Sequence, residues 1–259
     1  MRKKLGLALG AGSTKGLAHI GVLQVLLENE IPLDMIAGCS MGAIIGSIFA
    51  AGSDIYMLEK YVLSMKMREH LDLGNPIGSG GLIRGGRLEE LIRIFTHDKC
   101  FGETPILFYC VAVDVASAEL RVFDEGKIHR AVRASMSIPG VFTPVQINGR
   151  TYVDGGVIER VPCKALRERG ADVVVGVDVG YRGGEYDVSG MNAYMLINRS
   201  ADIMQWEITK LRGGEEDVLL VPEVLYVKGH FQMDQAREVI AEGRRVATEA
   251  LPRIRKLLK

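Results

Sequence analysis

Cysteine is scarce in this chain, and the formal net charge is zero. The cysteines, Cys39, Cys100, Cys110 and Cys163, stand far apart, with no Cys-x-x-Cys pair and no paired Cys/His spacing. This argues against a zinc site and a disulfide framework, so we expect no metal and a reducing cytoplasm. The 32 basic residues equal the 32 acidic ones and are scattered along the chain, which argues against nucleic acid as a partner.

Long apolar runs are missing as well. No stretch is long enough to span a membrane, and the apolar run after the basic start is too short for a secretion signal. There is no repeat, no low-complexity tract and no convincing linker. Because 259 residues at 47% apolar composition can bury one continuous core, we expect residues 1–259 to form a single domain.

Short apolar runs alternate with helical patterns along the chain. Strands are expected at residues 5–9, 35–39, 107–115, 119–123, 141–153, 173–179 and 218–221, and helices at about 15–30, 43–51, 54–70, 86–95, 127–137, 163–170, 191–212 and 234–258. Ser53 is expected to cap the third helix, and residues 72–86, rich in glycine, to form a loop. The alternation predicts a three-layer α/β/α fold with a mostly parallel central sheet.

A serine stands where the second strand runs into an apolar helix, in the sequence Gly38-Cys39-Ser40-Met41-Gly42. Gly-x-Ser-x-Gly at such a junction is the pattern of a nucleophile elbow. The turn is too tight for a bulky Cβ at Gly38 or Gly42, and it presents the serine hydroxyl at a helix N-terminus. Ser40 is therefore a candidate nucleophile for attack on an acyl carbonyl.

Residues 10–16, Gly10-Ala11-Gly12-Ser13-Thr14-Lys15-Gly16, join the first strand to the next helix. If the first two strands are neighbours, the backbone N–H groups of this loop lie beside Ser40 and can hold an oxyanion. A phosphate-binding loop needs glycine, lysine and serine or threonine in that order, but Lys15 precedes Gly16. A dinucleotide loop needs Gly-x-Gly-x-x-Gly and an acidic residue ending the second strand, so both nucleotide interpretations are disfavoured.

An acyl-transfer serine also needs a base, and the residues leave two hypotheses open. His230, with Asp178 as its acid, would complete a Ser-His-Asp triad. Alternatively Asp154 acts as the base directly, since it ends a predicted strand and is followed by Gly155 and Gly156.

Four segments resemble one family in order and spacing. Residues 10–16, 38–42, 133–142 and 154–156 match the patatin-like phospholipases, lipid acyl hydrolases that use a Ser-Asp dyad. The resemblance runs from about Leu5 to Pro162 and is to the short single-domain bacterial branch. It implies Ser40 as nucleophile and Asp154 as base. It further implies an oxyanion hole at Gly10, Ala11, Gly12 and Ser13, supported by Lys15, Gly16, Gly155 and Gly156.

The expected activity is that of a serine acyl hydrolase, of lipase or phospholipase A type, which cleaves fatty-acyl esters through an acyl-enzyme without a cofactor. Its lipid substrate would come from a membrane surface, met through exposed apolar residues of loop 72–86. Ala11 and Ser13 interrupt the glycine run of the family and favour one alternative, an acyl-binding regulatory or adaptor protein. The triad esterase is the other. Residues 157–160 are interpreted as a solvated charged face, and Met57, Met65 and Met67 as core packing rather than an acyl channel.

Overall fold

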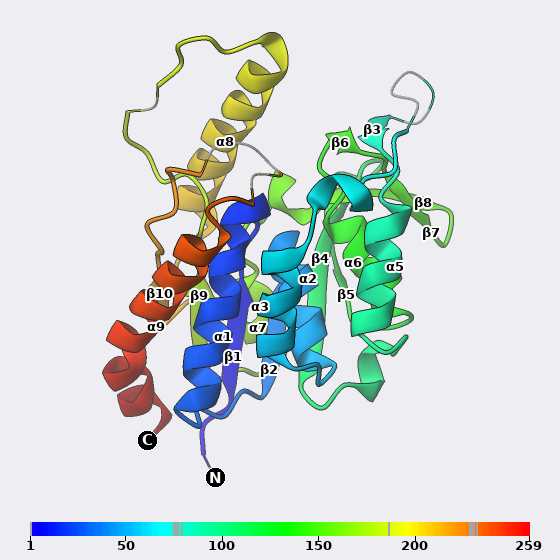
Figure 1. Ribbon diagram of the computed structural model, residues 1–259. Coiled ribbons are helices and arrows are strands. Elements are labelled where there is room, and N and C mark those ends of the chain that lie inside the picture. Colours follow the sequence, from blue (N-terminus) through cyan, green and yellow to red (C-terminus); the bar gives the residue numbers. More distant parts are fainter. Residues whose placement is uncertain (1, 75–77, 79, 186, 228–230, 232) are drawn as a thin grey trace.

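The computed structural model describes the chain except residues 1, 75–77, 79, 186, 228–230 and 232. A central sheet has the strand order β10-β9-β1-β2-β4-β8-β7, and β5 pairs with β4 (Figure 1). Its strands are β1 (Leu5–Leu9), β2 (Met35–Gly38), β4 (Leu107–Asp114), β5 (Glu119–Phe123), β7 (Val145–Ile147), β8 (Arg150–Asp154), β9 (Val173–Val177) and β10 (Val218–Leu220). Pairing is parallel from β10 through to β4 and antiparallel for β5, β7 and β8. The predicted mostly parallel sheet is confirmed.

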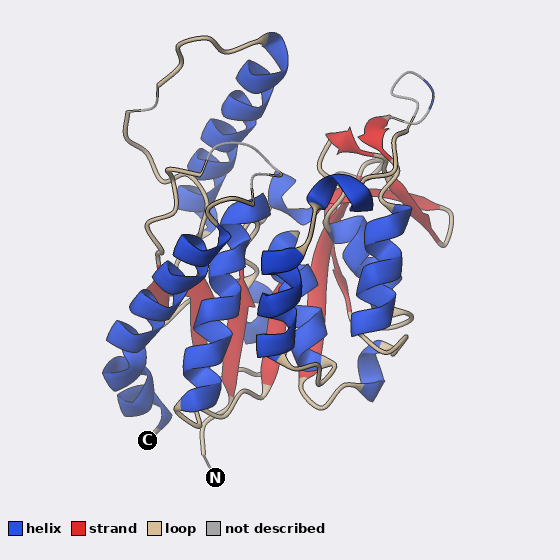
Figure 2. Ribbon diagram, in the orientation of Figure 1, coloured by secondary structure: helices blue, strands red, loops and turns tan. Residues whose placement is uncertain are grey.

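Helices cover both faces of this sheet (Figure 2). On one face α1 (Ala18–Glu28) packs against α9 (Ala236–Leu258) and also contacts α2 (Met41–Ala50), while α7 (Cys163–Arg167) contacts β1, β2 and β9 from the other. A Cβ at Gly21 of α1 would collide with the Ile240 carbonyl of α9, so these two helices touch backbone to backbone. The three-layer α/β/α prediction is therefore confirmed.

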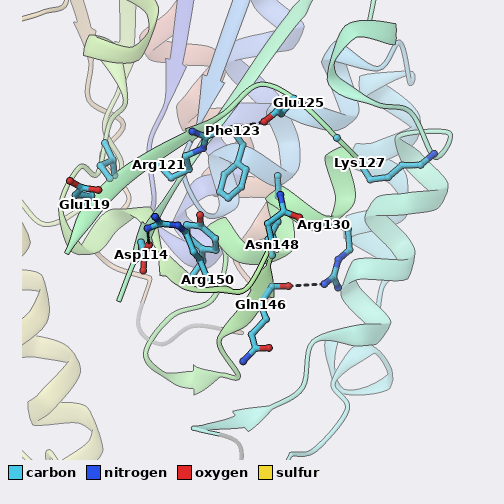
Figure 3. Close-up of a pocket in the computed structure, with 15 residues that line it drawn as sticks. Asp114, Glu119, Arg121, Phe123, Glu125, Lys127, Arg130, Gln146, Asn148 and Arg150 are labelled. Carbon is cyan, nitrogen blue, oxygen red and sulfur yellow. Dashed lines mark hydrogen bonds and ion pairs between the residues drawn. The ribbon is translucent and has the colours of Figure 1, made fainter. Parts of the chain in front are cut away.

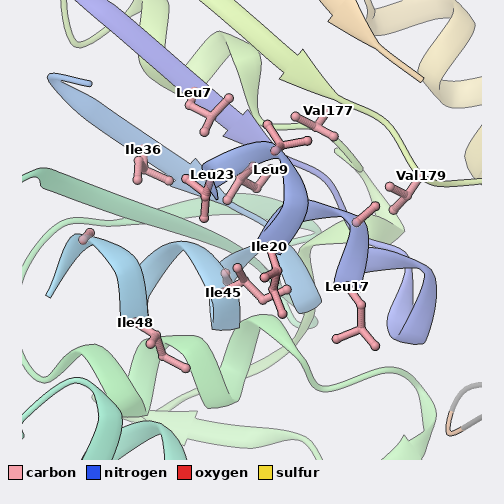
Figure 4. Close-up of a cluster of buried hydrophobic side chains, with 14 of the residues drawn as sticks. Leu7, Leu9, Leu17, Ile20, Leu23, Ile36, Ile45, Ile48, Val177 and Val179 are labelled. Atoms are coloured by element: carbon pink, nitrogen blue, oxygen red, sulfur yellow. The ribbon is translucent and has the colours of Figure 1, made fainter. Parts of the chain in front are cut away.

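The central strands β1, β2 and β9 are buried on both faces, as a sheet covered by helices requires. Every residue of β1 and of β9 is buried. Figure 4 shows part of this core, with Leu7, Leu9, Leu17, Ile20, Leu23, Ile36, Ile45, Ile48, Val177 and Val179 labelled. Because β1 pairs with β2, the loop after β1 lies next to the junction between β2 and α2, as expected.

The remaining helices are α3 (Ile55–Ser64), α5 (Gly86–Phe95), α6 (Ile128–Ser135) and α8 (Ala193–Arg212), with short 3-10 turns η1 (Ser13–Leu17), η2 (Met67–His70), η3 (Phe101–Glu103) and η4 (Gly155–Val157). Of these helices, α8 projects above the sheet on the left of Figure 1, and the others lie toward its centre and right. Met57 of α3 is 61% exposed, so its interpretation as core packing is wrong. Among the helices in the described part of the chain, none combines the length and the apolar character needed to cross a membrane.

Three local predictions are corrected. The cap of α3 is Asp54 rather than Ser53, since the Asp54 carboxylate accepts from the amides of Tyr56 and Met57. This helix ends at Ser64, because Met65 adopts an extended backbone. The predicted loop 72–86 contains β3 (Gly81–Ile83), which pairs in parallel with β6 (Gly140–Phe142). Propensity alone did not reveal β3, because its partner lies far along the chain.

The predicted strand at 141–153 is in fact three strands, β6, β7 and β8. Asn148 and Gly149 connect β7 to β8, and both have positive φ, at 51° and 76°. An Asn-Gly pair with this backbone is the usual two-residue hairpin turn. The turn sends β8 back along β4, so that Asp154 comes to lie opposite Ala112.

Candidate active site

Ser40 occupies the turn between β2 and α2 in a strained backbone conformation. Its φ is 54° and its ψ is −119°, and only 4% of the residue is exposed. A Cβ at Gly38 would collide with the backbone of Ala43, and one at Gly42 with the Leu9 carbonyl. Positive φ costs about 1–3 kcal/mol in a non-glycine residue, and such strain persists only where the surroundings enforce it. Here the close approach of the loop after β1 enforces it, at the N-terminus of α2.

Asp154 lies at the end of β8 and is 5% exposed. Its Oδ1 accepts a 2.8 Å hydrogen bond from the Gly156 amide and a 3.6 Å contact from the Cys39 thiol. Burial raises the pKa of this carboxyl to about 6, while hydrogen bonds from Ser40, Gly156 and Cys39 oppose the rise. A carboxylate whose pKa lies near neutral pH can accept a proton from a neighbouring hydroxyl and return it.

The segment that follows α6 holds both of these residues. The Ser40 amide donates to Ser135 Oγ at 2.9 Å, and the Asp154 amide donates to the Ser137 carbonyl at 2.9 Å. Both Ser135 and Ser137 are fully buried. The sequence comparison included these serines in the segment 133–142 without giving them a role. The sequence did contain a signal for buried, hydrogen-bonded serines, because both stand among the apolar residues Ala134, Met136 and Ile138.

Arg133 fixes this segment from within the protein. The guanidinium is buried and donates to Ser137 Oγ at 2.7 Å, to the Thr143 carbonyl at 2.9 Å and to the Arg84 carbonyl. Burial lowers its pKa to about 10, with the charges of Glu89 and Asp72 acting in the opposite direction. Arg133 thus connects α6 to the chain after β3 and to the turn after β6.

The loop after β1 differs from the prediction in the use of its amides. The Gly10 amide donates to the Val177 carbonyl at 3.0 Å, and the Ala11 amide to the Arg160 carbonyl at 2.9 Å. These two N–H groups already donate hydrogen bonds within the fold, so the prediction that they act as oxyanion donors is wrong. Gly12 and Ser13 are the other two residues of the predicted set, and both line the hollow that holds Ser40. Ser13 has a φ of 52°, a left-handed conformation that glycine adopts freely. The backbone strain of replacing glycine in this loop is therefore at Ser13.

The supporting residues of the prediction lie around the same point. A Cβ at Gly16 would stand 2.6 Å from Met41 Cγ, and one at Gly155 would stand 2.6 Å from the Val111 carbonyl. Gly156 donates its amide to Asp154. Lys15 is half-buried, and burial lowers its pKa, with the Asp202 charge opposing this and the Arg160 and Arg199 charges adding to it.

A hollow of about 200 Å³ brings Ser40 and Asp154 together with the loop after β1 and one side of α8. The α8 residues that line it include Asn198, Arg199, Asp202 and Gln205. They recur at helical spacing, but the sequence analysis treated this helix only as an element of the fold. The pattern alone could not have placed them here, because Ser40 and the loop after β1 lie far from α8 in the sequence.

Arg160 and Asp178 form a buried ion pair behind this hollow. Arg160 Nη2 lies 2.7 Å from Asp178 Oδ2, and the two side chains are 2% and 1% exposed. Arg182 also donates to Asp178, at 2.8 Å. The expectation that residues 157–160 form a solvated charged face is therefore wrong for Arg160. Asp178, the acid expected for His230, has arginine partners, and His230 itself lies outside the described residues.

A larger polar hollow of about 860 Å³ lies beside β5, β7 and β8, away from Ser40 (Figure 3). Several of its charged groups are paired within the protein, such as Arg150 with Asp114 at 2.5 Å and Arg121 with Glu125 at 3.4 Å. No group of three or more His, Cys, Asp or Glu side chains suited to hold a metal gathers among the residues described. The four cysteines, all of which are described, are free.

Comparison with known sequences places this geometry in a family. A profile described as patatin-like phospholipase matches residues 7–167. An uncharacterized NTE family protein of Mycobacterium tuberculosis is 33% identical over 177 residues, which cover 68% of this chain and 49% of that protein. Lysophospholipase NTE1 of Coccidioides immitis is 34% identical over 189 residues, covering 69% and 12%. The chain thus spans about half or less of the length of these curated relatives.

Solved structures share the fold at low sequence identity. VipD from Legionella pneumophila superposes with a TM-score of 0.61 at 16% identity, covering 97% of this chain and 67% of that one. The type III effector ExoU gives a TM-score of 0.55 at 15% identity, covering 99% and 54%. On the profile match, which extends over more than half of its residues and includes Ser40 and Asp154, this chain belongs to the patatin-like phospholipase family.

Proposed function

We propose that the protein is a serine acyl hydrolase that cleaves fatty-acyl esters of lipids with Ser40 as nucleophile and Asp154 as base. The observation that carries this proposal is the pairing of the two side chains. Ser40 is held in a strained turn at the start of α2, and it lines one hollow with the buried carboxyl of Asp154, whose pKa burial raises to about 6 and Ser40 lowers. The family and the lysophospholipase among the relatives support lipid esters as the substrate class.

The reaction would proceed through an acyl-enzyme. Asp154 accepts the Ser40 proton while Ser40 Oγ bonds to the ester carbonyl carbon, and the carbonyl electron pair moves to oxygen. Amides at Gly12 and Ser13 and the N-terminus of α2 stabilise this oxyanion, with about 3 kcal/mol for one good donor. The carbon–oxygen bond to the alcohol then breaks, and the alcohol leaves with the proton from Asp154. Water, deprotonated by Asp154, attacks the acyl carbonyl. The bond to Ser40 Oγ then breaks, and Asp154 returns the proton to Ser40 as the fatty acid leaves. This scheme requires no cofactor.

The substrate would be met at a lipid surface. Leu73 and Leu82, which lie near the two ends of the predicted docking loop, are 80% and 44% exposed, and Leu82 belongs to β3. β3 lies at the same end of the molecule as α8, which lines the hollow with Ser40 (Figure 1). Exposed apolar side chains of this kind mark surfaces that contact a protein or a membrane. Transient contact with lipid is therefore part of the proposal.

A regulatory protein that binds an acyl ligand without turning it over is the second candidate. It is favoured by Ser13, which keeps a left-handed backbone where glycine would be relaxed, and by the loss of the Gly10 and Ala11 amides as donors. Retention of both Ser40 and Asp154 counts against it.

Hydrolysis of p-nitrophenyl esters and phospholipid vesicles tests the proposal, together with labelling by a fluorophosphonate. Ser40→Ala and Asp154→Asn should each abolish turnover, while His230→Ala should retain it. Ser47→Ala and Asp114→Asn are matched controls, because both residues are buried and neither lines the Ser40 hollow. If the wild type neither hydrolyses an ester nor takes up the label, the hydrolase is excluded and the regulator is favoured. If Ser40→Ala and His230→Ala are inactive while Asp154→Asn retains turnover, the triad esterase replaces the dyad.

A further inference from the structure

His19 stands near the start of α1 with its whole side chain inside the protein. None of the residue is exposed, and burial lowers the pKa of the imidazole to about 4, while the hydrogen bond with Gly10 and the charge of Asp178 act in the opposite direction. The ring is therefore neutral at pH 7, with one N–H and one nitrogen lone pair. Figure 4 shows this part of the core, with Leu17 and Ile20 labelled on either side of His19 in the sequence. The proposed reaction does not use this histidine.

The two ring nitrogens of His19 differ in their surroundings. Nε2 lies 2.8 Å from the Gly10 carbonyl oxygen, and because a carbonyl only accepts, Nε2 carries the hydrogen. Nδ1 is then an acceptor, and it is buried with no donor within reach among the residues described. A buried acceptor without a partner is costly. An apolar side chain would fill the same space without that cost, so the benefit of a histidine here lies in its bond to Gly10.

That bond holds one peptide unit at both of its ends. The carbonyl of Gly10 accepts from His19, and the amide of the same peptide unit, which belongs to Ala11, donates to the Arg160 carbonyl at 2.9 Å. The Gly10 amide in turn donates to the Val177 carbonyl at 3.0 Å. Because a peptide bonded through both its N–H and its C=O cannot rotate without losing both bonds, the chain leaves β1 in a fixed direction.

The backbone that this peptide leads into is strained. Ser13 has a φ of 52°, and a non-glycine residue keeps such a conformation only where its surroundings enforce it. Gly12 stands between the fixed peptide and Ser13, and a Cβ on it would collide with Val179. Both Gly12 and Ser13 line the hollow that holds Ser40. The fixed peptide therefore sets how the chain enters the strained residue beside the nucleophile.

His19 also contacts the other end of this loop. A Cβ at Gly16 would stand 3.5 Å from His19 Cδ2, so the imidazole packs against Gly16 while its Nε2 donates to Gly10. One rigid ring thus touches the first and the last residue of loop 10–16. Gly12 and Ser13 lie between these two points of contact.

We propose that His19 is a positioning residue that fixes loop 10–16, so that the amides of Gly12 and Ser13 face Ser40 and stabilise the oxyanion. The proposal rests on the proposed function, because it takes Ser40 to be the nucleophile. His19 is not itself a lining residue of the Ser40 hollow, so it acts on the reaction through the Gly10 carbonyl and not by contact with the substrate.

Three substitutions of His19 separate its hydrogen bond from its bulk. His19→Gln keeps an N–H as many bonds from the backbone as Nε2, whereas the N–H of His19→Asn reaches only to the level of Nδ1, and His19→Leu has none. Gln24→Leu is the control for loss of a buried polar group on α1, because Gln24 is 1% exposed and donates to Glu59 at 2.7 Å, away from the loop. Thermal unfolding followed by circular dichroism selects variants that remain folded at the assay temperature.

The first measurement is kcat and KM for a p-nitrophenyl ester. We expect His19→Leu and His19→Asn to lower kcat by about tenfold or more with little change in KM, since the oxyanion donors lose their alignment. His19→Gln should recover most of kcat, and Gln24→Leu should stay within a few fold of wild type. Equal losses of kcat in folded His19→Gln and His19→Leu proteins would overturn the proposal.

A second substitution tests the connection to the strained residue. Glycine adopts the left-handed conformation freely, so in the Ser13→Gly background the loop needs less enforcement. His19→Leu should therefore cost clearly less kcat in that background than in the wild type, as a double-mutant cycle measures. A loss of the same size in both backgrounds would overturn the connection between His19 and Ser13.

Hydrogen exchange of the peptide that covers residues 10–17, followed by mass spectrometry, does not need catalysis. His19→Leu should accelerate this exchange by about tenfold or more, while His19→Gln and Gln24→Leu leave it near wild type. If the wild type hydrolyses no ester but exchange responds in this way, His19 positions the loop and the hydrolase proposal fails. If the wild type is active and neither kcat nor exchange responds to His19→Leu, the hydrolase stands and the proposal for His19 fails.

Discussion

The amide of Ser40 donates a 2.9 Å hydrogen bond to Oγ of Ser135, a residue 95 positions further along the chain. The carbonyl of Ser137, two residues later, accepts from the amide of Asp154. One short segment therefore fixes the backbone of both proposed catalytic residues. A displacement of this segment would move the nucleophile and the base together.

Ser135→Ala is expected to lower kcat by about tenfold or more while changing KM little. The variant leaves the buried Ser40 amide without its acceptor, which costs about 1–3 kcal/mol and loosens the turn that aims the hydroxyl. Steady-state kinetics on a p-nitrophenyl ester measure the effect, with Ser47→Ala as the buried serine control. Ser135→Thr keeps the hydroxyl and should recover much of kcat. Equal loss in the alanine and threonine variants would contradict this positioning role.

The activity should depend on pH through Asp154. Burial raises the pKa of this carboxyl to about 6, and only the ionised form can take the proton of Ser40. We therefore expect kcat/KM to rise tenfold per pH unit below about pH 6 and to level off above it. A pH profile with a soluble ester measures this, after correction for unfolding at the acid end. A plateau that extends down to pH 4.5 would exclude Asp154 as the base with this pKa.

Asp154→Asn should stabilise the protein above pH 6. Because the pKa of Asp154 is higher in the folded protein than its ordinary value of 3.8, the folded state binds more protons between about pH 4 and pH 6. Stability from this group is thus lost as pH rises through 6, by about 3 kcal/mol for a shift of about two units. Urea unfolding at pH 4 and pH 8 measures it. The stabilising effect should shrink strongly at pH 4, and an equal effect at both pH values would refute the explanation.

Asp178→Asn should destabilise the fold by about 3–5 kcal/mol, because Arg160 would remain buried without its charged partner. Urea unfolding gives the free energy, and Asp114→Asn, whose partner Arg150 is well exposed, should cost less. At a temperature where Asp178→Asn is folded, its kcat should stay within a few fold of wild type. A hundredfold loss of kcat in folded protein would instead support Asp178 as the acid of a triad.

The parts that sequence reasoning reached are those encoded locally. The apolar runs of β1, β2 and β9 and the Gly-x-Ser-x-Gly at residues 38–42 each carry their own pattern within a few residues. Adjacency of β1 and β2 followed from the helix between them. These local signals were sufficient to bring Ser40, the loop after β1 and Asp154 into one hypothesis before any distance was known.

What the sequence could not supply depends on distant partners. The Gly10 and Ala11 amides donate to the carbonyls of Val177 and Arg160, and no residue near Gly10 in the sequence indicates these acceptors. From the sequence, Arg160 was predicted to be a surface charge, because its buried ion pair with Asp178 could not be foreseen. The polar side of α8 could be assigned to the candidate site only once the structure showed that it lines the Ser40 hollow. The assignment of residues 1–259 to one domain stays a prediction.

The position of β1 has a consequence for the order of folding. This strand is synthesised before both of its partners, β2 and β9, and its hydrogen bonds to β9 join residues 5–9 to residues 173–177. One apolar edge of β1 therefore stays unpaired until β9 has been made. Such distant pairing slows folding and leaves a nascent chain exposed to aggregation, so protein yield in the cell should depend on chaperones that cover this edge during synthesis.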